Sequence, residues 1–261
     1  MSKKLRIMLL VVLGIVATGL ADDTTMNMYA FVEDFSWKEQ VSHIEGDFVD
    51  ESGFRYGIGG AVNIFSSGGF GLIIGGEGYL GAVDYKGGVQ NIQTGQYSPY
   101  NSKTSYYGIR GNLDLGYKFR GNNYVLTPYC GYGVDFWDRV LDADLFESEG
   151  QHGYSEVWLY TAARIGAGGQ YTLNQSVNVF GDLCLNIFPY VSEYISSGSG
   201  DVTLEPEGKI GFDFEVGLSY NDVLFSFFWK ERQFDKSDEN DGSYQPDSDE
   251  RRIGVQIGLI F

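Results

Sequence analysis

The sequence predicts an all-β fold, a ten-stranded antiparallel transmembrane up-and-down β-barrel. Three observations carry this prediction. Apolar and polar residues alternate with a period of two along many segments, as they do in strands with two different faces. The connections between these segments alternate strictly between short turns and long loops, and the chain ends in an alternating strand whose last residue is Phe261.

The N-terminus predicts a cleaved signal peptide at residues 1–21. The first residues carry three positive charges, and an apolar run from Ile7 to Ala17 and small residues up to Ala21 follow. The alternative is a membrane-anchoring helix, but the apolar stretch is only 15 residues, short of the ~20 that a spanning helix needs. We therefore expect residues 22–261 to form one domain, the barrel with its five long extracellular loops.

The composition and net charge exclude one class of partner and favour a β-structure. The chain has 35 acidic and 18 basic residues, a net charge of −17, which becomes −20 when the three charges of the signal peptide are removed. Because phosphate binding needs a basic surface, no nucleic-acid partner is expected. The aromatic content of 16% and the 37 glycines suit strands, tight turns and a crowded barrel interior.

The C-terminal segment has the most specific pattern. From Ile253 to Phe261 every second residue is apolar, and the residues between them begin with Gly, Gln and Gly. This pattern resembles the closing strand and assembly signal of Gram-negative outer-membrane β-barrel proteins, which end in Phe. The resemblance implies a location in the cell outer membrane, surrounding lipids and lipopolysaccharide, and the barrel assembly machinery as a partner during biogenesis.

Ten strands are expected, at residues 27–39, 52–65, 70–86, 103–120, 124–139, 155–172, 176–193, 208–220, 223–236 and 250–261. Turns of two to four residues alternate with loops of 12 to 16 residues. Short turns belong to the periplasmic rim of such barrels and long loops to the extracellular rim. An even number of strands closes the barrel without an exposed edge.

The polar face of the strands predicts a lumen filled by charged side chains. Inward parity selects eight basic and six acidic residues and therefore a nearly neutral interior: Arg55, Glu77, Arg110, Asp114, Lys118, Asp135, Arg139, Arg164, Asp182, Asp213, Glu215, Lys230, Arg232 and Arg252. The short turns predict that four hairpins each supply an opposite-charge pair. Asp213 would face Lys230 and Arg110 would face Asp135, while Arg55 would lie diagonal to Glu77 and Arg164 diagonal to Asp182. Such pairs satisfy groups that would otherwise be buried unpaired, so a filled lumen is favoured over an ion-conducting path.

The two cysteines are not expected to form a disulfide, although the periplasm is oxidising. Parity places Cys130 on the outward face of its strand and Cys184 on the inward face of another. A zinc site is not expected from two thiols without an imidazole pair, and no cofactor is expected. The segment Gly76–Gly81 has the spacing of a dinucleotide-binding motif, but a barrel strand with small lumen residues explains it better, because no helical pattern follows.

The number of strands and the chain length are similar to those of the omptins, outer-membrane proteases that place an Asp pair opposite an Asp-x-His pair. The only histidines are His43 and His152, and the positions two residues before them hold Val41 and Gly150. Asp142-x-Asp144 is an acidic pair in the same loop as His152. The sequence therefore lacks the catalytic motif of the omptins. We expect a protein without enzymatic activity rather than an enzyme.

The long loops hold most of the excess negative charge. They carry 16 acidic residues and no Lys or Arg. The acidic loop residues selected as a candidate surface are Asp142, Asp144, Asp238, Glu239, Asp241, Asp247 and Asp249. Such a surface is either a solvated, repulsive rim or a site for divalent cations or a basic partner. The leading hypothesis is a non-enzymatic structural or surface-binding protein that acts through these loops; the alternatives are an omptin-like hydrolase and a narrow, porin-like pore for small solutes.

Overall fold

A computed structural model describes residues 23–41, 47–90, 97–141, 155–197, 200–240 and 243–261. These residues form a single antiparallel sheet of thirteen strands. The strands are β1 (Asp23–Gln40), β2 (Asp47–Phe65), β3 (Phe70–Gln90), β4 (Tyr97–Tyr117), β5 (Phe119–Arg120), β6 (Tyr124–Leu141), β7 (Ser155–Thr172), β8 (Val177–Ser197), β9 (Gly200–Leu204), β10 (Glu207–Gly208), β11 (Gly211–Tyr220), β12 (Val223–Asp235) and β13 (Asp247–Ile260). No helix of the described residues is long and apolar enough to cross a membrane.

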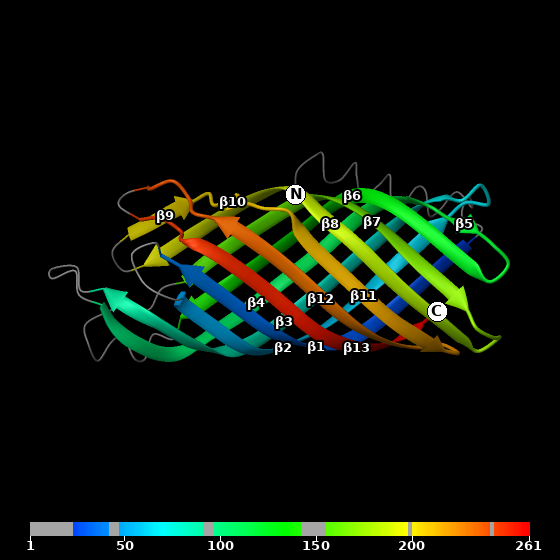
Figure 1. The fold of residues 1–261 in the computed structure, drawn as a ribbon, viewed down its shortest axis with the longest axis horizontal. Coiled ribbons are helices and arrows are strands. Elements are labelled where there is room, and N and C mark those ends of the chain that lie inside the picture. Colours follow the sequence, from blue (N-terminus) through cyan, green and yellow to red (C-terminus); the bar gives the residue numbers. More distant parts are fainter. Residues whose placement is uncertain (1–22, 42–46, 91–96, 142–154, 198–199, 241–242) are drawn as a thin grey trace.

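The sheet closes on itself. Ten long strands follow one another around the wall, and β13 pairs with both β12 and β1. The pairing of β1 with β13 runs from Asn27–Ile260 to Gln40–Asp247. Figure 1 shows these strands tilted and side by side around one cylinder. The predicted ten-stranded up-and-down barrel is therefore confirmed, with β5, β9 and β10 as short additions to it.

The strands extend further at the extracellular end than their sequence patterns predicted. β2 begins at Asp47 rather than residue 52, and β4 begins at Tyr97 rather than residue 103. The fourth loop was expected to be irregular, but β9 folds back on β8 within it. Backbone groups continue to pair in these hairpins because unpaired N–H and C=O groups are costly even where side-chain alternation has ended.

Two short turns have backbone conformations that set the register. Asn221 has a φ of 51° in the turn between β11 and β12, and Gly69 has a φ of 90° in the turn between β2 and β3. Positive φ suits tight hairpin turns and favours Asn and Gly. The two-residue turn at Asn221 places Asp213 opposite Lys230, as expected.

Of the three other predicted registers, one is right and two are wrong. Arg110 lies opposite Asp135 in the pairing of β4 with β6, as expected. Arg55 lies opposite Gly81, because the pairing of β2 with β3 starts at Phe65–Gly71, so the predicted diagonal to Glu77 is wrong. A longer turn between β7 and β8 likewise places Arg164 opposite Asn186, and its predicted diagonal to Asp182 is wrong.

The outer surface of the wall carries an exposed apolar band. Large apolar side chains that face outward on all sides of the barrel include Met28, Ile58, Leu80, Ile109, Val134, Ile165, Leu183, Val216, Phe227 and Ile257. On the extracellular side the outward positions become polar, as at Asp34, Ser52, Asp84, Asp138 and Glu231. A continuous apolar surface of this extent around a closed barrel is covered by lipid.

Aromatic rings border the band on its periplasmic side. Phe70, Tyr117 and Phe119 form two edge-to-face contacts, each with ring centroids 4.7 Å apart. Tyr124, Tyr171, Tyr220 and Phe261 are also exposed at this rim, and Tyr107 and Trp229 at the other. Aromatic rings at both borders of an apolar band are typical of the two membrane interfaces of such barrels.

The interior divides into two halves. In the extracellular half the inward positions hold buried rings such as Phe35, Trp37, Tyr106 and Trp158, which pack as one hydrophobic core. The stacked pair of Trp137 and Trp158 has centroids 5.5 Å apart at an interplanar angle of 6°. In the periplasmic half many of the inward positions hold smaller residues such as Gly, Asn and Thr, and a cavity lies among them.

Both cysteines are free, as expected. Cys130 is exposed on the outward face of β6 and Cys184 is buried on the inward face of β8. The two thiols point to opposite sides of the wall, so no disulfide can join them without a change of register.

The apolar band predicts a depth-dependent response to charge. Ile58 is 71% exposed at the middle of the outward face of β2, so Ile58→Arg should reduce the free energy of unfolding in lipid vesicles by about 2–4 kcal/mol. Ser52→Arg, on the same face but beyond the band, should cost much less. Equal losses for the two variants, measured by denaturant unfolding, would show that the band is misplaced.

Candidate functional site

The lumen is the candidate site, because it collects most of the charged groups of the described strands. Three regions follow one another along its axis. From the extracellular end these regions are an acid cluster, a network of ion pairs at the middle, and a cavity in the periplasmic half.

The middle network is centred on Glu33 of β1, which is fully buried. Its carboxylate is 2.7 Å from Nη2 of Arg55 and 3.1 Å from Nη2 of Arg110. The first contact follows from register, since Glu33 and Arg55 are direct cross-strand partners. The second reaches across from β4 because the lumen is narrow.

A second centre of this network is Asp135 of β6. Its carboxylate accepts hydrogen bonds from the hydroxyl group of Tyr79 at 3.0 Å, from Arg232 at 2.9 Å and from Arg252 at 3.3 Å. Glu250 lies 3.4 Å from the same two arginines. Charges buried this deeply are tolerated only where several partners satisfy them.

Aromatic faces cover the guanidinium groups of the network. The Cζ atom of Arg55 lies 3.7 Å from the ring centre of Phe35, and that of Arg232 lies 4.1 Å from the ring centre of Tyr160. Arg110 lies 4.6 Å from the ring centre of Tyr79. These cation–π contacts join the ion pairs to the aromatic core, so that both close the same section of the lumen.

The predicted lumen residues all face inward, but their ionic partners differ from those expected. Lys230 lies 3.8 Å from Glu77, and Asp213 lies 3.5 Å from Arg164, although Asp213 and Lys230 are register partners. Long side chains reach past their cross-strand neighbours, so register fixes the Cα pairing without fixing the terminal contact.

The other expected pairs are exchanged in the same way. Arg110 contacts Glu77 and Glu33 rather than Asp135. Arg164 contacts Asp114 at 3.2 Å, and Asp182 accepts a hydrogen bond from the hydroxyl group of Tyr129 at 2.7 Å.

The sequence-based selection missed six inward carboxylates, and the expectation of a nearly neutral lumen is wrong. The missed residues, all buried, are Glu33, Glu39, Glu51, Glu156, Glu193 and Glu250. With them the inward set holds twelve acidic and eight basic groups. The parity of these positions could have identified them. Glu33 and Glu39 lie on the same face of β1 as Phe31, Phe35 and Trp37, but a face that carries so many aromatic rings does not resemble the polar face of a strand.

The acid cluster at the extracellular end consists of Glu39, Glu51, Arg139, Glu156 and Glu193. Arg139 Nη2 is 2.7 Å from Glu51, and Arg139 Nη1 is 2.6 Å from Glu156 and 3.5 Å from Glu39. Indole N–H groups also donate, from Trp37 to Glu39 at 2.8 Å and from Trp158 to Glu156 at 3.0 Å. One guanidinium thus serves three carboxylates.

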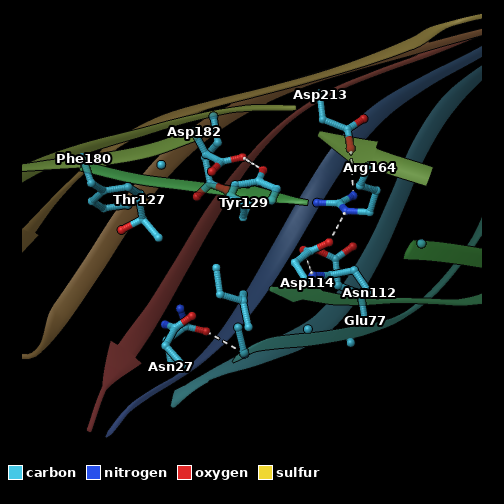
Figure 2. A pocket seen from close by; sticks show the side chains of 18 of the residues that line it. Asn27, Glu77, Asn112, Asp114, Thr127, Tyr129, Arg164, Phe180, Asp182 and Asp213 are labelled. Carbon is cyan, nitrogen blue, oxygen red and sulfur yellow. Dashed lines mark hydrogen bonds and ion pairs between the residues drawn. The ribbon is translucent and has the colours of Figure 1, made fainter. Parts of the chain in front are cut away.

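The cavity in the periplasmic half has a volume of about 480 Å³, and both polar and apolar side chains line it. Figure 2 shows Arg164 between Asp114 and Asp213, with Asp182 and Tyr129 beside them. Asp182 lies directly opposite Glu215 in the pairing of β8 with β11. Ser226 and Gln256 donate to Glu215. The cavity ends at the middle network, since Arg110, Lys230 and Arg252 line it.

The described part of the chain offers no evident metal centre. No three His, Cys, Asp or Glu side chains in it converge as metal ligands do. The histidines and the pair Asp142 and Asp144 lie outside the described residues.

The candidate surface in the fifth loop is smaller than expected. Asp238 and Glu239 are exposed there, and Asp241 is outside the described residues. Asp247 and Asp249 belong to β13 rather than to the loop, because pairing with β1 continues to Gln40. Asp247 accepts a hydrogen bond from the backbone N–H of Lys236 at 2.9 Å.

Comparisons with known proteins give the fold. No protein-family model matches the sequence, and no curated protein matches it. Among solved structures, the outer membrane protease OmpT from Escherichia coli is similar over 92% of this chain and 97% of its own, with a TM-score of 0.65 and 12% identity. The outer membrane protein OprG from Pseudomonas aeruginosa matches over 93% and 98% with a TM-score of 0.43 and 10% identity. The similarity to OmpT supports the barrel fold, and the exposed apolar band around the closed barrel agrees with a location in the cell outer membrane.

The buried network predicts that truncating the buried Arg55 costs much more stability than truncating the exposed Lys209. Arg55→Met should lower the free energy of unfolding by about 3–5 kcal/mol, because Glu33 loses its closest cation within the protein interior. Lys209→Met removes the exposed pair with Asp235 and should change stability by no more than about 1 kcal/mol. The measurement is denaturant unfolding of both refolded variants, and similar losses would contradict the network.

Proposed function

We propose that this chain is a non-conducting outer-membrane barrel with a non-enzymatic structural or surface-binding role at its extracellular end. The observation that carries the proposal is the filled extracellular half of the lumen. There Phe35, Trp37, Tyr106 and Trp158 are at most 1% exposed, and the ion pairs of Glu33 and Asp135 lie beneath them. A solute would have to displace both layers to cross.

The periplasmic cavity does not change this conclusion. A conducting barrel needs a continuous aqueous path, whereas this cavity ends at Arg110, Lys230 and Arg252. Opening the path would separate buried charges from their partners, at a cost of several kcal/mol for each. The packed side chains of the lumen therefore stiffen the wall of the barrel and do not serve transport.

The extracellular end supports binding of cations or of a basic partner. Asp238 and Glu239 are exposed there, close in sequence to Lys236, and residues 237–249 carry five acidic residues and no Lys or Arg. Repulsion among these carboxylates is screened over ~10 Å at 0.1 M salt. A divalent cation would relieve that repulsion and could link the rim to the phosphates of neighbouring lipopolysaccharide.

A hydrolase remains the second candidate, because the structure is similar to that of an outer membrane protease. The likeness concerns the fold, and the Asp-x-His pair of the omptins is missing from this sequence. Turnover of peptide substrates by refolded protein tests this candidate directly.

The filled lumen predicts that wild-type protein gives no steady conductance in planar lipid bilayers. A variant that opens both layers, with Trp37→Ala and Trp158→Ala combined with Arg55→Ala and Arg110→Ala, should conduct, whereas the two tryptophan changes alone leave the ion pairs in place and should not. Trp229→Ala is the matched control, since Trp229 faces outward and is 39% exposed. Conductance by wild-type protein, or an equal response from the control, would contradict the closed lumen.

The acidic rim predicts weak, salt-sensitive binding of Ca²⁺ or a polycation. A variant with Asp238, Glu239, Asp241, Asp247 and Asp249 replaced by Asn or Gln should bind less without unfolding, because Asp238 and Glu239 are exposed outside the strands and the changes at Asp247 and Asp249 remove no backbone pairing of β13. Calorimetry on both proteins measures the difference. If wild type binds neither ligand, or the variant binds equally well, the rim is only a solvated surface.

A further inference from the structure

The acid cluster lies beyond the apolar band. The outward neighbours of its strands at this level are polar, such as Lys38 on β1, Ser52 on β2 and Asp138 on β6. The cluster is therefore enclosed by the part of the barrel that projects from the membrane, and not by the lipid-covered wall.

Three of the four glutamates in the cluster have donors that justify a negative charge. Arg139 contacts Glu39, Glu51 and Glu156. Thr104 donates to Glu51 at 2.9 Å, and Tyr106 donates to its other oxygen. The indole groups described above complete the shells of Glu39 and Glu156.

Glu193 is different. Its side chain is fully buried, and no described residue donates a hydrogen bond to either of its carboxylate oxygens. It projects from β8 opposite Trp158 of β7 and Leu204 of β9, neither of which gives its carboxylate a donor. A buried carboxylate without a donor costs far more than the remaining contacts of one side chain can supply.

A positive ion, either a metal ion or a proton, must therefore neutralise the carboxylate of Glu193. A divalent metal is disfavoured, because no three acidic side chains of the described residues converge as ligands. Arg139 already occupies the space among the other three carboxylates. A proton needs one acceptor only, and the carboxylate of Glu156, which lies diagonal to Glu193 in the pairing of β7 with β8, supplies it.

We propose that Glu193 is a proton-binding site, whose neutral carboxyl group donates to Glu156 and keeps the extracellular end of the lumen closed. No bond other than the O–H bond changes: the proton is taken from water when the barrel closes and returned when the cluster opens. The site goes beyond the proposed surface role, since it lies inside the barrel and away from the loop carboxylates.

Its surroundings favour the neutral form. Burial and then the charges of Glu156 and Glu39 raise the pKa of Glu193 well above its usual range, and Arg139 opposes them. The titratable groups packed around it come from several strands: Glu39 (β1), Glu51 (β2), Tyr85 (β3), Tyr106 (β4), Arg139 (β6) and Glu156 (β7). Only Arg139 among them is cationic, so ionising Glu193 would add a fourth negative charge around a single positive one.

The sign of the pH dependence follows from this shift. In the unfolded chain Glu193 ionises near pH ~4.3, whereas in the folded barrel it keeps its proton to higher pH. Its stabilising contribution is complete below the unfolded pKa and is lost as pH rises through the folded pKa. Between the two values, the unfolding constant should rise roughly tenfold per pH unit for this one proton.

The test is the variant Glu193→Gln, which has nearly the shape of the neutral acid and carries its own donor. Unfolding of refolded barrel is followed by tryptophan fluorescence, since Trp37, Trp137 and Trp158 lie in the core around the cluster. Between pH 5 and pH 8 the free energy of unfolding of wild type should fall more steeply than that of Glu193→Gln. The difference in slope should correspond to about one proton. The exposed Glu207→Gln is the matched control and should keep the wild-type slope.

Infrared difference spectra give an independent readout. Wild type at pH 7 should show a protonated-carboxyl stretch that Glu193→Gln lacks and Glu207→Gln retains. Equal pH slopes for wild type and Glu193→Gln, or an unchanged carboxyl band, overturn the proposal. A stabilisation of wild type by Ca²⁺ that Glu193→Gln loses also overturns it, because the bound cation would then be a metal.

Discussion

The structure depends on one constraint, which is that every backbone N–H and C=O group within a bilayer must find its partner inside the protein. The pairing of β1 with β13 meets this constraint, because it removes the last free edge of the sheet. Closure also fixes which face of each strand is the lumen. The exposed apolar band and the buried charges are the two consequences, one on each side of the same wall.

A narrow lumen then forces its side chains into contact. Long arginines leave the level of their own Cα atoms and reach carboxylates two or more strands away, as Arg110 reaches Glu33. Each buried charge gains several partners, and the arginines also pack on rings such as Phe35 and Tyr79. The result is a core that is ionic and aromatic together, in place of the aliphatic core of a soluble domain.

The two halves of the lumen differ because the inward positions differ in size. Toward the extracellular end these positions hold Trp, Tyr and Phe, and toward the periplasmic end they hold Gly, Asn, Thr and shorter acids. A barrel of constant width is filled by the first set and left partly open by the second. This distribution closes the barrel to the outside while leaving a cavity on the periplasmic side, and it leaves Glu193 enclosed with a single cation in its cluster.

The sequence by itself determined the number of strands, their inward and outward faces, the two rims, and the opposite orientations of Cys130 and Cys184. These features depend on a period of two and on turn residues, which are local properties. Where turn length was read correctly, as at Asn221, the register followed as well. Only the tertiary structure decided the ionic partners, the closed extracellular half, and the burial of Glu39, Glu51, Glu156 and Glu193 around Arg139. The physical reason is that contacts across a lumen depend on the diameter of the closed barrel and the shear between its strands. The shear is the sum of the registers of all the strand pairs, and the register of β2 with β3 alone places Arg55 opposite Gly81 and away from Glu77.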